Sequence, residues 1–408
     1  MARAQVVVGL DIGTAKICTL IGEVKGSLVQ VVGVGVAPSR GIRKGIVVDM
    51  EDAAAAIASS LRKAETFSGY KIVGAYVAVS GAHLECEPVH GQITLSRERA
   101  VSRQDLADVL GVARPEEVPE GRRTLHVLPK GYVVDGEDGI NNPLGMLAST
   151  LEVEGLRVTA GSAPLLNLAR CVERAGIQID GFVSAGLASA YAALSESERQ
   201  LGVLLIDIGG GTTDLVWIRE DAVQYVGAVP FGGNHVTNDL SMVLGLPFAA
   251  AEELKVQFAS AAPGSVPGDE MVDVGAYSDA EIKEIPRRLM AEVAEARLSE
   301  LLSMGEDELR AGGFDRVLPA GVVLTGGSAQ LRGMREMVQD VFGVPARIGQ
   351  PEGLDGPVDS VVSPVYSTGV GLLKWVLAQP GDLASSRPAR RNTSLFGRLK
   401  GMIRAFLP

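Results

Sequence analysis

Two glycine-rich turns, each at the end of an apolar β-rich run, constrain this chain more than any other feature. The first run, residues 6–10, leads into Asp11-Ile12-Gly13-Thr14, and the second, residues 203–206, leads into residues 207–214, DIGGGTTD. Backbone N–H groups in such turns can bind phosphate oxygens. The repeat therefore predicts two related halves with a phosphate-binding cleft between them.

The second turn is the more specific of the two. An Asp-Gly turn after a strand is ordinary turn chemistry, so the first turn alone is also explained without a ligand. A run of glycines followed by two threonines costs backbone entropy on folding, and a plain turn needs nothing so permissive. Asp11 and Asp207 end the two strands, and we expect both to bind Mg²⁺ through water, because Mg²⁺ keeps part of its hydration shell.

A third strand-then-glycine segment, residues 322–328, has the same form. Another expected strand ends at Gly232 and Gly233. Glycine pairs at such positions let the backbone lie flat against a base or a ribose. We therefore expect the nucleoside part of a ligand near Gly232, Gly233, Gly326, Gly327 and Ser328.

Glu252 and Lys255 lie on an expected helix and share one face, because they are three residues apart. The carboxylate could take ribose hydroxyls while the ammonium group lies near the base or the phosphates. The alternative is a solvated salt bridge between the two side chains.

The chain resembles a known superfamily through a series of motifs in a fixed order. These are DIGTAK, GLASAY, IDIGGGTTD, FGGNHVTNDL, AEELK and LTGGSAQLRGM. They are similar to the nucleotide-binding superfamily of actin, sugar kinases and Hsp70. Within it, the FtsA family of bacterial cell division proteins resembles nearly the whole chain, including residues 126–132 and 139–145 in an insertion that actin lacks there. The resemblance implies an α/β, actin-like (ribonuclease H-like) two-lobed ATPase fold with a family-specific inserted α+β subdomain and a C-terminal amphipathic helix.

The resemblance also implies ATP and Mg²⁺ as cofactors and assigns the nucleotide-binding residues. The first phosphate loop would contain Asp11, Gly13, Thr14 and Lys16. The second would contain Asp207, Gly209, Gly210, Gly211, Thr212 and Thr213. The nucleoside would be surrounded by Gly232, Gly233, Glu252, Lys255, Gly326, Gly327 and Ser328.

The domain boundaries follow from the motifs and the resemblance together. The first lobe is expected at residues 1–83 and 159–200, with a returning segment near 364–378, and the inserted subdomain at 84–158. The core of the second lobe is expected at 201–235 and 319–363, and its mostly helical subdomain at 236–318. A flexible linker would span residues 379–393, and the amphipathic helix residues 394–408.

Ala185 marks a departure from the wider superfamily. Actins that hydrolyse ATP readily place Glu or Gln at this position, where the side chain orients the attacking water. An alanine can neither accept a proton nor align water. We therefore expect ATP binding with at most weak ATPase activity.

The last fifteen residues form a basic amphipathic segment. Its apolar residues fall within an arc of roughly 140° at about 100° per residue. The segment is too short to span a bilayer, which takes about 20 apolar residues, and fits a helix in the membrane interface. The residues expected to contact the membrane are Leu395, Phe396, Arg398, Leu399, Lys400, Met402, Ile403, Arg404, Phe406 and Leu407.

The alternative for this tail is packing on the protein's own core or on another helix. Against it, residues 379–392 are rich in Pro, Ser, Gly and Arg and resemble a flexible tether. Residues 383–408 contain six basic and no acidic residues, whereas the whole chain has a net charge of −11, so residues 1–382 carry −17. An anionic lipid surface would therefore attract the basic tail and repel the acidic remainder of the chain.

Composition and the resemblance together define the expected partners. An acidic chain without clustered Cys or His is not typical of a nucleic-acid or metal-cluster protein, and nothing resembling a signal peptide precedes the first strand. The resemblance implies that the chain binds the FtsZ C-terminal peptide, with Arg297 and Glu300 contributing, and that it self-associates into filaments. It also implies anionic lipids and later division proteins as partners. The expected location is the division septum, on the cytoplasmic face of the inner membrane. For Arg297, a surface salt bridge is the alternative.

Two other functions fit the same fold. A small-molecule kinase would need a catalytic acid or base at the terminal phosphate and would have no evident use for the tail. An actin-like scaffold of a pilus or secretion machine would share the nucleotide loops, but such proteins usually reach the membrane through a protein partner.

Local patterns predict several individual elements. We expect a β-meander over residues 6–36, a helix over 49–63, a helix opened by Ser102 with Asp105 three residues on, and helical structure over 161–198. Residues 279–304 have the spacing of an amphipathic helix interrupted by Pro286.

Overall fold

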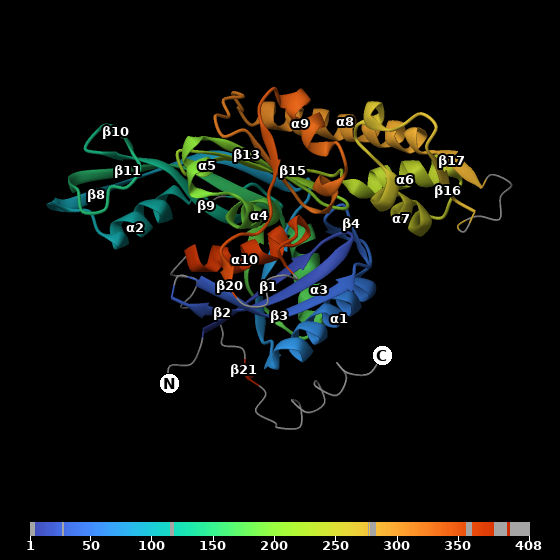
Figure 1. Cartoon of the computed structure of the whole chain (residues 1–408). Coiled ribbons are helices and arrows are strands. Elements are labelled where there is room, and N and C mark those ends of the chain that lie inside the picture. The colour runs from blue at the N-terminus through green and yellow to red at the C-terminus, as the bar shows by residue number, and fades with distance from the viewer. Residues whose placement is uncertain are drawn as a thin grey trace.

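A computed structural model describes residues 5–26, 28–114, 118–275, 277, 283–355, 361–378 and 390–391. The chain folds into two stacked lobes (Figure 1). An extended subdomain projects from one side of the molecule, and a mostly helical subdomain projects from the other. The two-lobed architecture expected from the sequence is therefore present.

The first lobe is built on a mixed sheet with the strand order β12-β7-β1-β2-β3-β20. An antiparallel meander forms β1 to β3, and β7 runs parallel to β1. Alternate residues of β3 are buried, so one face of this strand packs against the core. The strands are β1 (Gln5–Ile12), β2 (Lys16–Lys25), β3 (Leu28–Pro38), β7 (Gly74–Val79), β12 (Gln178–Ser184) and β20 (Leu354–Asp355), with short strands β4 (Ile42–Arg43), β5 (Ile46–Val47) and β6 (Tyr70–Lys71) beside them.

The second lobe repeats this topology. Its strand order is β15-β14-β13-β18-β19, with an antiparallel meander followed by parallel strands. Both halves therefore place a tight turn between their first two strands. The strands are β13 (Val203–Ile208), β14 (Thr213–Arg219), β15 (Ala222–Val229), β18 (Val322–Thr325) and β19 (Ala346–Ile348).

Two buried helices, α4 (Ala185–Ala193) and α10 (Ser367–Ala378), join the lobes. Side chains of both helices share one hydrophobic core with residues from both sheets. The helices cross so closely that a Cβ atom added to Gly371 would lie 1.7 Å from the carbonyl oxygen of Ala188. Glycine is therefore required at this crossing.

The outer face of each sheet has its own helical cover. In the first lobe α1 (Met50–Ser68), capped by Asp49, and α3 (Ser162–Arg174) pack on a second core. In the second lobe the cover includes α6 (Gly233–Leu244), α7 (Phe248–Phe258), α8 (Arg287–Ala311) and α9 (Met334–Phe342). The remaining elements there are α5 (Glu196–Leu201), β16 (Met271–Asp273), β17 (Glu284–Pro286) and the short 3-10 helices at Pro263–Ser265, Gly327–Gln330 and Pro364–Tyr366.

The inserted subdomain is an antiparallel sheet with one helix. Its strand order is β10-β9-β11-β8, and α2 packs against it. The expected capping box forms between Ser102 and Asp105 at the start of α2. The elements are β8 (Leu84–Ala100), α2 (Arg103–Ala113), β9 (Arg122–Val134), β10 (Glu137–Ile140) and β11 (Leu147–Gly161).

His126 anchors this subdomain to the interlobe helices. Its Nε2 accepts a hydrogen bond of 3.1 Å from the backbone N–H of Ser184, immediately before α4. Its ring lies 4.9 Å from the Trp375 ring of α10. Burial lowers the pKa of His126 to about 4, so the imidazole is a neutral acceptor at pH 7.

Two expectations about local structure are wrong. Residues 161–198 are not helical throughout, because Gln178–Ser184 forms β12, which pairs with β7 in parallel. The helix expected over 279–304 begins only after Pro286, because residues 284–286 pair with β16 and the extended backbone of Pro286 caps α8. In both cases strand pairing with a distant segment decides the conformation.

The C-terminal segment lies almost entirely outside the described residues. The amphipathic helix expected at 394–408 and most of the expected linker fall there. Residues 390–391 form a short strand, β21 (Arg390–Arg391; Figure 1), and this strand pairs with β6 of the first lobe.

We predict that Gly371→Ala destabilises the protein because the new methyl group cannot fit at the crossing of α4 and α10. Overpacking of this kind costs about 2–3 kcal/mol of unfolding free energy. Gly111→Ala on α2 is the matched control, because nothing lies within 4 Å of its added Cβ. The control should be neutral or stabilising by up to about 1 kcal/mol. Thermal unfolding measures both, and equal midpoints for the two variants would contradict the packing argument.

Candidate functional site

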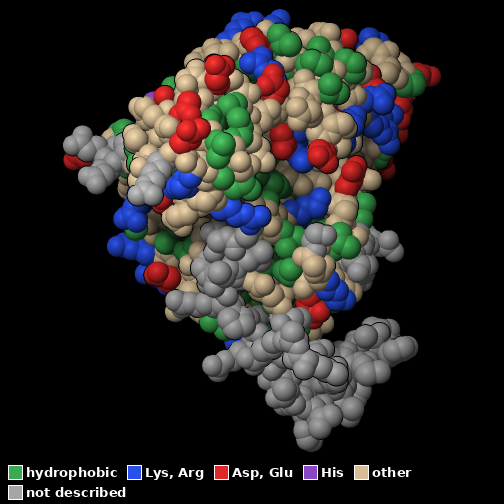
Figure 2. Space-filling model, turned by 90° about the vertical axis from the view of Figure 1, so that its left-hand side faces the viewer, with side chains coloured by type: hydrophobic (Ala, Val, Ile, Leu, Met, Phe, Trp, Pro, Cys, Tyr) green, Lys and Arg blue, Asp and Glu red, His purple; other side chains and the backbone are tan. Residues whose placement is uncertain are grey.

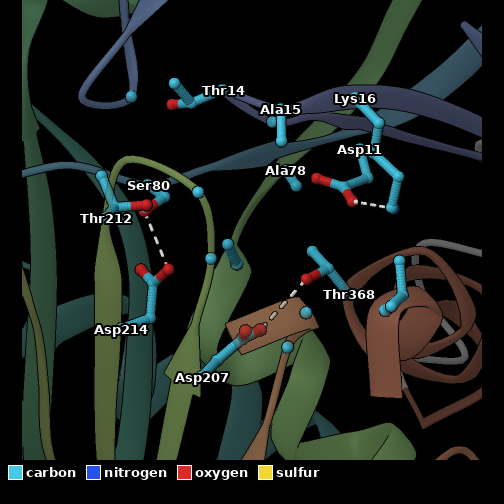
Figure 3. Close-up of a pocket in the computed structure, with 18 of the residues that line it drawn as sticks. Asp11, Thr14, Ala15, Lys16, Ala78, Ser80, Asp207, Thr212, Asp214 and Thr368 are labelled. Atoms are coloured by element: carbon cyan, nitrogen blue, oxygen red, sulfur yellow. Dashed lines mark hydrogen bonds and ion pairs between the residues drawn. The ribbon is translucent and has the colours of Figure 1, made fainter. Parts of the chain in front are cut away.

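A pocket lies between the lobes, at the carboxyl ends of β1 and β13 (Figure 3). Both lobes and the segment before α10 contribute to its wall. The lining residues are Asp11, Ile12, Gly13, Thr14, Ala15, Lys16, Gly45, Ala78, Ser80, Ala185, Asp207, Gly209, Gly210, Thr212, Asp214, Gly326, Gly327, Pro364, Val365 and Thr368.

Two equivalent turns face each other across this pocket. The N–H of Gly13 donates to the carbonyl of Lys16 at 3.0 Å, and the N–H of Gly209 donates to the carbonyl of Thr212 at 2.9 Å. A Cβ atom on Gly211 would lie 2.6 Å from Oγ1 of Thr14. The glycines of the second turn therefore let the two lobes approach closely.

The first turn carries an ion pair. Nζ of Lys16 lies 3.6 Å from Oδ2 of Asp11, and both side chains are mostly buried. Burial raises the pKa of Asp11, and the ammonium group partly offsets this. Burial lowers the pKa of Lys16, but Asp11, together with Cys18 and Tyr366, raises it above its usual value, so the ammonium group remains charged.

The second turn carries the buried carboxylate of Asp207. Oδ2 accepts hydrogen bonds from Oγ of Ser189 on α4 at 2.5 Å and from Oγ1 of Thr368 on α10 at 3.2 Å. Burial, reinforced by the charge of Asp11, raises the pKa of Asp207 to about 6. Both helices that join the lobes thus contact one carboxylate in the pocket.

A third buried carboxylate, Asp214, belongs to β14. Its Oδ2 accepts a hydrogen bond of 2.8 Å from the hydroxyl of Ser80, which follows β7 in the first lobe. Its Oδ1 is buried and has no hydrogen-bond partner among the described residues. Burial and the neighbouring charge of Asp207 raise the pKa of Asp214 well above its usual range.

These features fit a ligand that combines phosphate with a hydrated cation. The pocket has three carboxylates, one lysine, and backbone N–H groups in glycine turns. In the described part of the chain, no group of three or more His, Cys, Asp and Glu side chains is arranged to hold a metal ion alone. Mg²⁺ needs no such cage, because it is bound by one or two carboxylates together with water and phosphate oxygens.

The structure brings most of the predicted phosphate residues to the pocket wall. From the first loop these are Asp11, Gly13, Thr14 and Lys16, and from the second they are Asp207, Gly209, Gly210 and Thr212. Gly326 and Gly327 also line it. The predicted residues outside the lining are Gly211, Thr213, Gly232, Gly233, Glu252, Lys255 and Ser328.

The residues predicted around the nucleoside form a layer behind the second turn. The N–H of Gly233 donates to the carbonyl of Gly209 at 2.9 Å, and Oγ of Ser328 donates to the same carbonyl at 3.3 Å. Nζ of Lys255 lies 2.7 Å from Oε2 of Glu252 and donates to the carbonyl of Gly233. Glu252 and Lys255 therefore form a salt bridge, but the Lys255 side chain is buried and not solvated.

Several lining residues were not predicted from the sequence. Asp214 belongs to the DIGGGTTD motif, so its position in that motif was an available signal. Ser80 and Thr368 follow no recognisable motif and reach the pocket only through the fold. The other lining residues not predicted are Ile12, Ala15, Gly45, Ala78, Pro364 and Val365. Ala185 also lines the pocket, and the sequence analysis noted it only as a position where an alanine cannot orient the attacking water.

Arg297 and Glu300, predicted to contact a partner, lie on α8. Nε of Arg297 is 2.5 Å from Asp239 of α6, and its NH1 is 2.5 Å from Glu300. The pair with Asp239 joins α8 to α6, whereas the pair with Glu300 lies within α8. All residues predicted to contact the membrane lie outside the described ranges.

Comparisons with known protein families identify similar sequences over nearly the whole chain. Residues 204–371 match the family described as "Cell division protein FtsA", and residues 81–159 match the "SHS2 domain inserted in FTSA". Cell division protein FtsA of Pseudomonas aeruginosa is 39% identical over 379 residues, covering 93% of this chain and 91% of that protein. The protein of the same name from Bacillus subtilis is 35% identical over 376 residues, covering 92% of this chain and 84% of that protein.

Solved structures share the fold at low sequence identity. The PilM-PilN type IV pilus biogenesis complex gives a TM-score of 0.63 at 17% identity, covering 94% of this chain and 99% of that chain. MreB 5 of Spiroplasma citri bound to AMPPNP gives a TM-score of 0.53 at 15% identity, covering 93% of this chain and 99% of that chain. At these identities the comparisons show the actin-like fold alone.

We predict that Asp207→Asn stabilises the ligand-free protein in a pH-dependent manner. The folded carboxyl group has a raised pKa, so the folded state binds the proton more tightly than the unfolded state does. The parent therefore loses stability as pH rises from about 4 to about 6. The gain for Asp207→Asn should grow over this window to at most about 3 kcal/mol.

Denaturant unfolding between pH 4 and pH 8 measures this gain. Asp108→Asn, at an exposed site on α2, is the control and should show no such trend. If the difference in unfolding free energy between the parent and Asp207→Asn stayed constant with pH, the argument that burial raises the pKa of Asp207 would be wrong.

Proposed function

This chain belongs to the FtsA family of cell division proteins, and from this membership and the interlobe pocket we propose that it binds Mg·ATP, self-associates and attaches the FtsZ ring to the membrane. It is an actin-like cell division protein and a component of the division machinery. The observation that carries the proposal is the pair of facing turns with Asp11, Lys16 and Asp207 between them.

ATP binding follows from the charges and donors of the pocket. The glycine turns would bind phosphate oxygens through backbone N–H groups, and Lys16 would neutralise part of their charge. Asp11 and Asp207 would hold Mg²⁺ through its water ligands. When bound, Mg²⁺ would neutralise the charge that the buried carboxylates and the phosphates share. Residues 232–233 and 326–328, with Glu252 and Lys255 behind them, would surround the nucleoside.

Membrane attachment is proposed through residues 394–408. No helix in the described ranges has both the length and the apolar content to cross a bilayer. Each basic residue near anionic lipid contributes about 1 kcal/mol, and each buried large apolar side chain about 1.5–3 kcal/mol. Coupled folding of the tail costs a few kcal/mol in return, so a single tail binds reversibly. Protomers aligned in a filament would bind with several tails at once and far more tightly.

The helical subdomain is the proposed docking site of the FtsZ C-terminal peptide. The side chains of Met242, Val243 and Val256 on α6 and α7 are more than half exposed, with exposed fractions of 75%, 54% and 71%. Arg297 on the adjacent α8 keeps a side-chain exposure of 26% beside its ion pairs. Exposed apolar side chains on α6 and α7, with a partly exposed cation on α8, would fit a peptide with both apolar and acidic residues. Later division proteins would be recruited to the assembled filament.

The two alternative functions are weaker. A small-molecule kinase would leave the basic amphipathic tail without a role. A pilus or secretion scaffold would agree with the fold likeness to PilM, but the relatives that match over most of the chain are division proteins. The proposed place of action is therefore the cytoplasmic face of the inner membrane at the septum.

We predict that the protein binds a fluorescent ATP analogue in the presence of Mg²⁺ and that Asp207→Ala weakens this binding at least about tenfold, which corresponds to about 1.4 kcal/mol. The substitution removes a carboxylate on the side of the pocket where Mg²⁺ is expected. Chelation of Mg²⁺ should weaken binding to the parent in the same direction. Asp108→Ala on α2 serves as the control with parental affinity. An Asp207→Ala variant with unchanged affinity would place the nucleotide elsewhere.

We predict that the full chain recruits a labelled FtsZ C-terminal peptide to anionic vesicles. Phe406→Glu puts a charge into the lipid-facing arc and should release both protein and peptide on sedimentation. Arg297→Ala should keep the protein on the vesicles but lose most of the peptide. Arg288→Ala, also on α8 and paired with Glu292, is the matched control for the second variant. Retention of Phe406→Glu on vesicles would exclude the tail as the anchor.

A further inference from the structure

The short strand β21 fixes the place where the chain leaves the first lobe and enters the basic tail. Arg390 pairs with Lys71 and Arg391 with Tyr70, in an antiparallel arrangement along β6. β6 lies between the end of α1 and the start of β7. Because β7 runs parallel to β1 and reaches the pocket at its carboxyl end, β6 lies at the opposite end of the first lobe. This end points away from the second lobe (Figure 1).

Few residues separate β21 from the segment expected to lie on the membrane. The basic amphipathic segment begins at residue 394, three positions after Arg391. A chain covers at most about 3.6 Å per residue, so this span is no longer than about 11 Å. The headgroup layer on each side of a bilayer is about 5–8 Å thick. A tail bound in the membrane interface therefore brings β6 and its neighbours close to the lipid headgroups.

Large apolar side chains are exposed at this end of the first lobe. Phe67, in the last turn of α1, has an exposed fraction of 63%, and Leu28, at the start of β3, has 52%. The turn before Leu28 lies beside the start of β1, which places it at the same end of the sheet as β6. Phe and Leu are among the side chains that proteins bury at the boundary between headgroups and acyl chains.

The edge formed by α1, β6 and β21 is basic. Residues 62–71, from the last turns of α1 through β6, contain three basic residues and one acidic residue, and with the two arginines of β21 they carry a net charge of +4. Lys71 keeps an exposed fraction of 65%, although its Nζ lies 3.0 Å from Oε1 of Glu65. Elsewhere, acidic side chains are spread among basic and apolar ones, as on the face seen in Figure 2. An anionic surface therefore attracts this edge, although residues 1–382 as a whole carry −17.

Neighbouring carboxylates leave most of this positive charge in place. Glu23 on β2 accepts a hydrogen bond of 2.6 Å from the hydroxyl of Tyr70, which holds it against the protein. Glu173 is next in sequence to Arg174 at the end of α3, so the two add no net charge. The edge therefore combines exposed apolar groups with cations, which is the chemistry of an interfacial lipid contact.

We propose that this end of the first lobe, with Leu28, Phe67, Lys71 and β21, is a second contact surface for anionic lipid. The proposal rests on the proposed attachment through residues 394–408. Phe67 enters the boundary between headgroups and acyl chains, and Lys71 lies among the anionic headgroups. The contact orients each protomer, so that the pocket and the helical subdomain face away from the membrane. A flexible tail alone cannot impose such an orientation.

Tryptophan fluorescence of the full chain tests this surface directly. The chain has two tryptophans, Trp217 and Trp375, and both are buried at 5% exposure. A new surface tryptophan therefore reports its own surroundings. On anionic vesicles with brominated acyl chains, Phe67→Trp should show quenching beyond that of the parent, because the ring enters the lipid. Leu201→Trp, at a position of the second lobe with 58% exposure, is the matched control and should show none.

Vesicle sedimentation measures the contribution of the same surface to affinity. Lys71→Gln should weaken binding to anionic vesicles about fivefold and leave binding to zwitterionic vesicles unchanged. Phe67→Ser should weaken binding to anionic vesicles about tenfold. Leu201→Ser and Arg288→Gln are the controls with parental affinity, since Arg288 is an exposed cation that is also paired with a carboxylate.

The outcomes separate this surface from the tail. Absence of added quenching at position 67, on vesicles that bind the protein, would overturn the inference whatever the affinities are. Weaker sedimentation of Phe67→Ser without quenching of Phe67→Trp would also overturn it and would assign the surface to contacts between copies of the chain. If the parent did not bind anionic vesicles at all, the proposed attachment through the tail would be wrong, and this inference with it.

Discussion

The concentration of negative charge between the lobes is the constraint on which the rest of the structure depends. Asp11, Asp207 and Asp214 lie around one pocket, and Lys16 is the cation among the described residues that line it. Burial of so many carboxylates is unfavourable unless hydrogen bonds and cations compensate. The hydroxyls of Ser189, Thr368 and Ser80 supply part of this compensation. Mg²⁺ with the donors of a nucleotide-binding turn would supply the remainder.

The compensation comes from elements that also hold the lobes together. Ser189 is on α4 and Thr368 is on α10, and these helices cross at Gly371 within the shared core. His126 ties the inserted subdomain to the residue before α4. Direct contacts therefore run from Asp207 in the pocket to both interlobe helices and from the start of α4 to the inserted subdomain. This gives a physical route by which nucleotide binding can influence self-association in the proposed function.

The sequence alone was sufficient for the parts that local chemistry determines. The two turns are recognisable because glycine and aspartate follow apolar strands, and the Ser102 cap follows from its spacing to Asp105. The parts that sequence reasoning missed depend on distant contacts. β12 is a strand because it pairs with β7, and Ser80 reaches Asp214 across 134 residues of sequence. Asp214 was within a recognised motif, but its place in the pocket wall and its hydrogen bond to Ser80 become visible only in the structure.

The central claim is that a nucleotide lies between the two turns, and a crystal structure with Mg²⁺ and a non-hydrolysable ATP analogue tests it most directly. The account predicts phosphate density between residues 13–16 and 209–212, with the metal close to Asp11 and Asp207. Density for the analogue on any other surface, with this pocket left empty at saturating ligand, would contradict it.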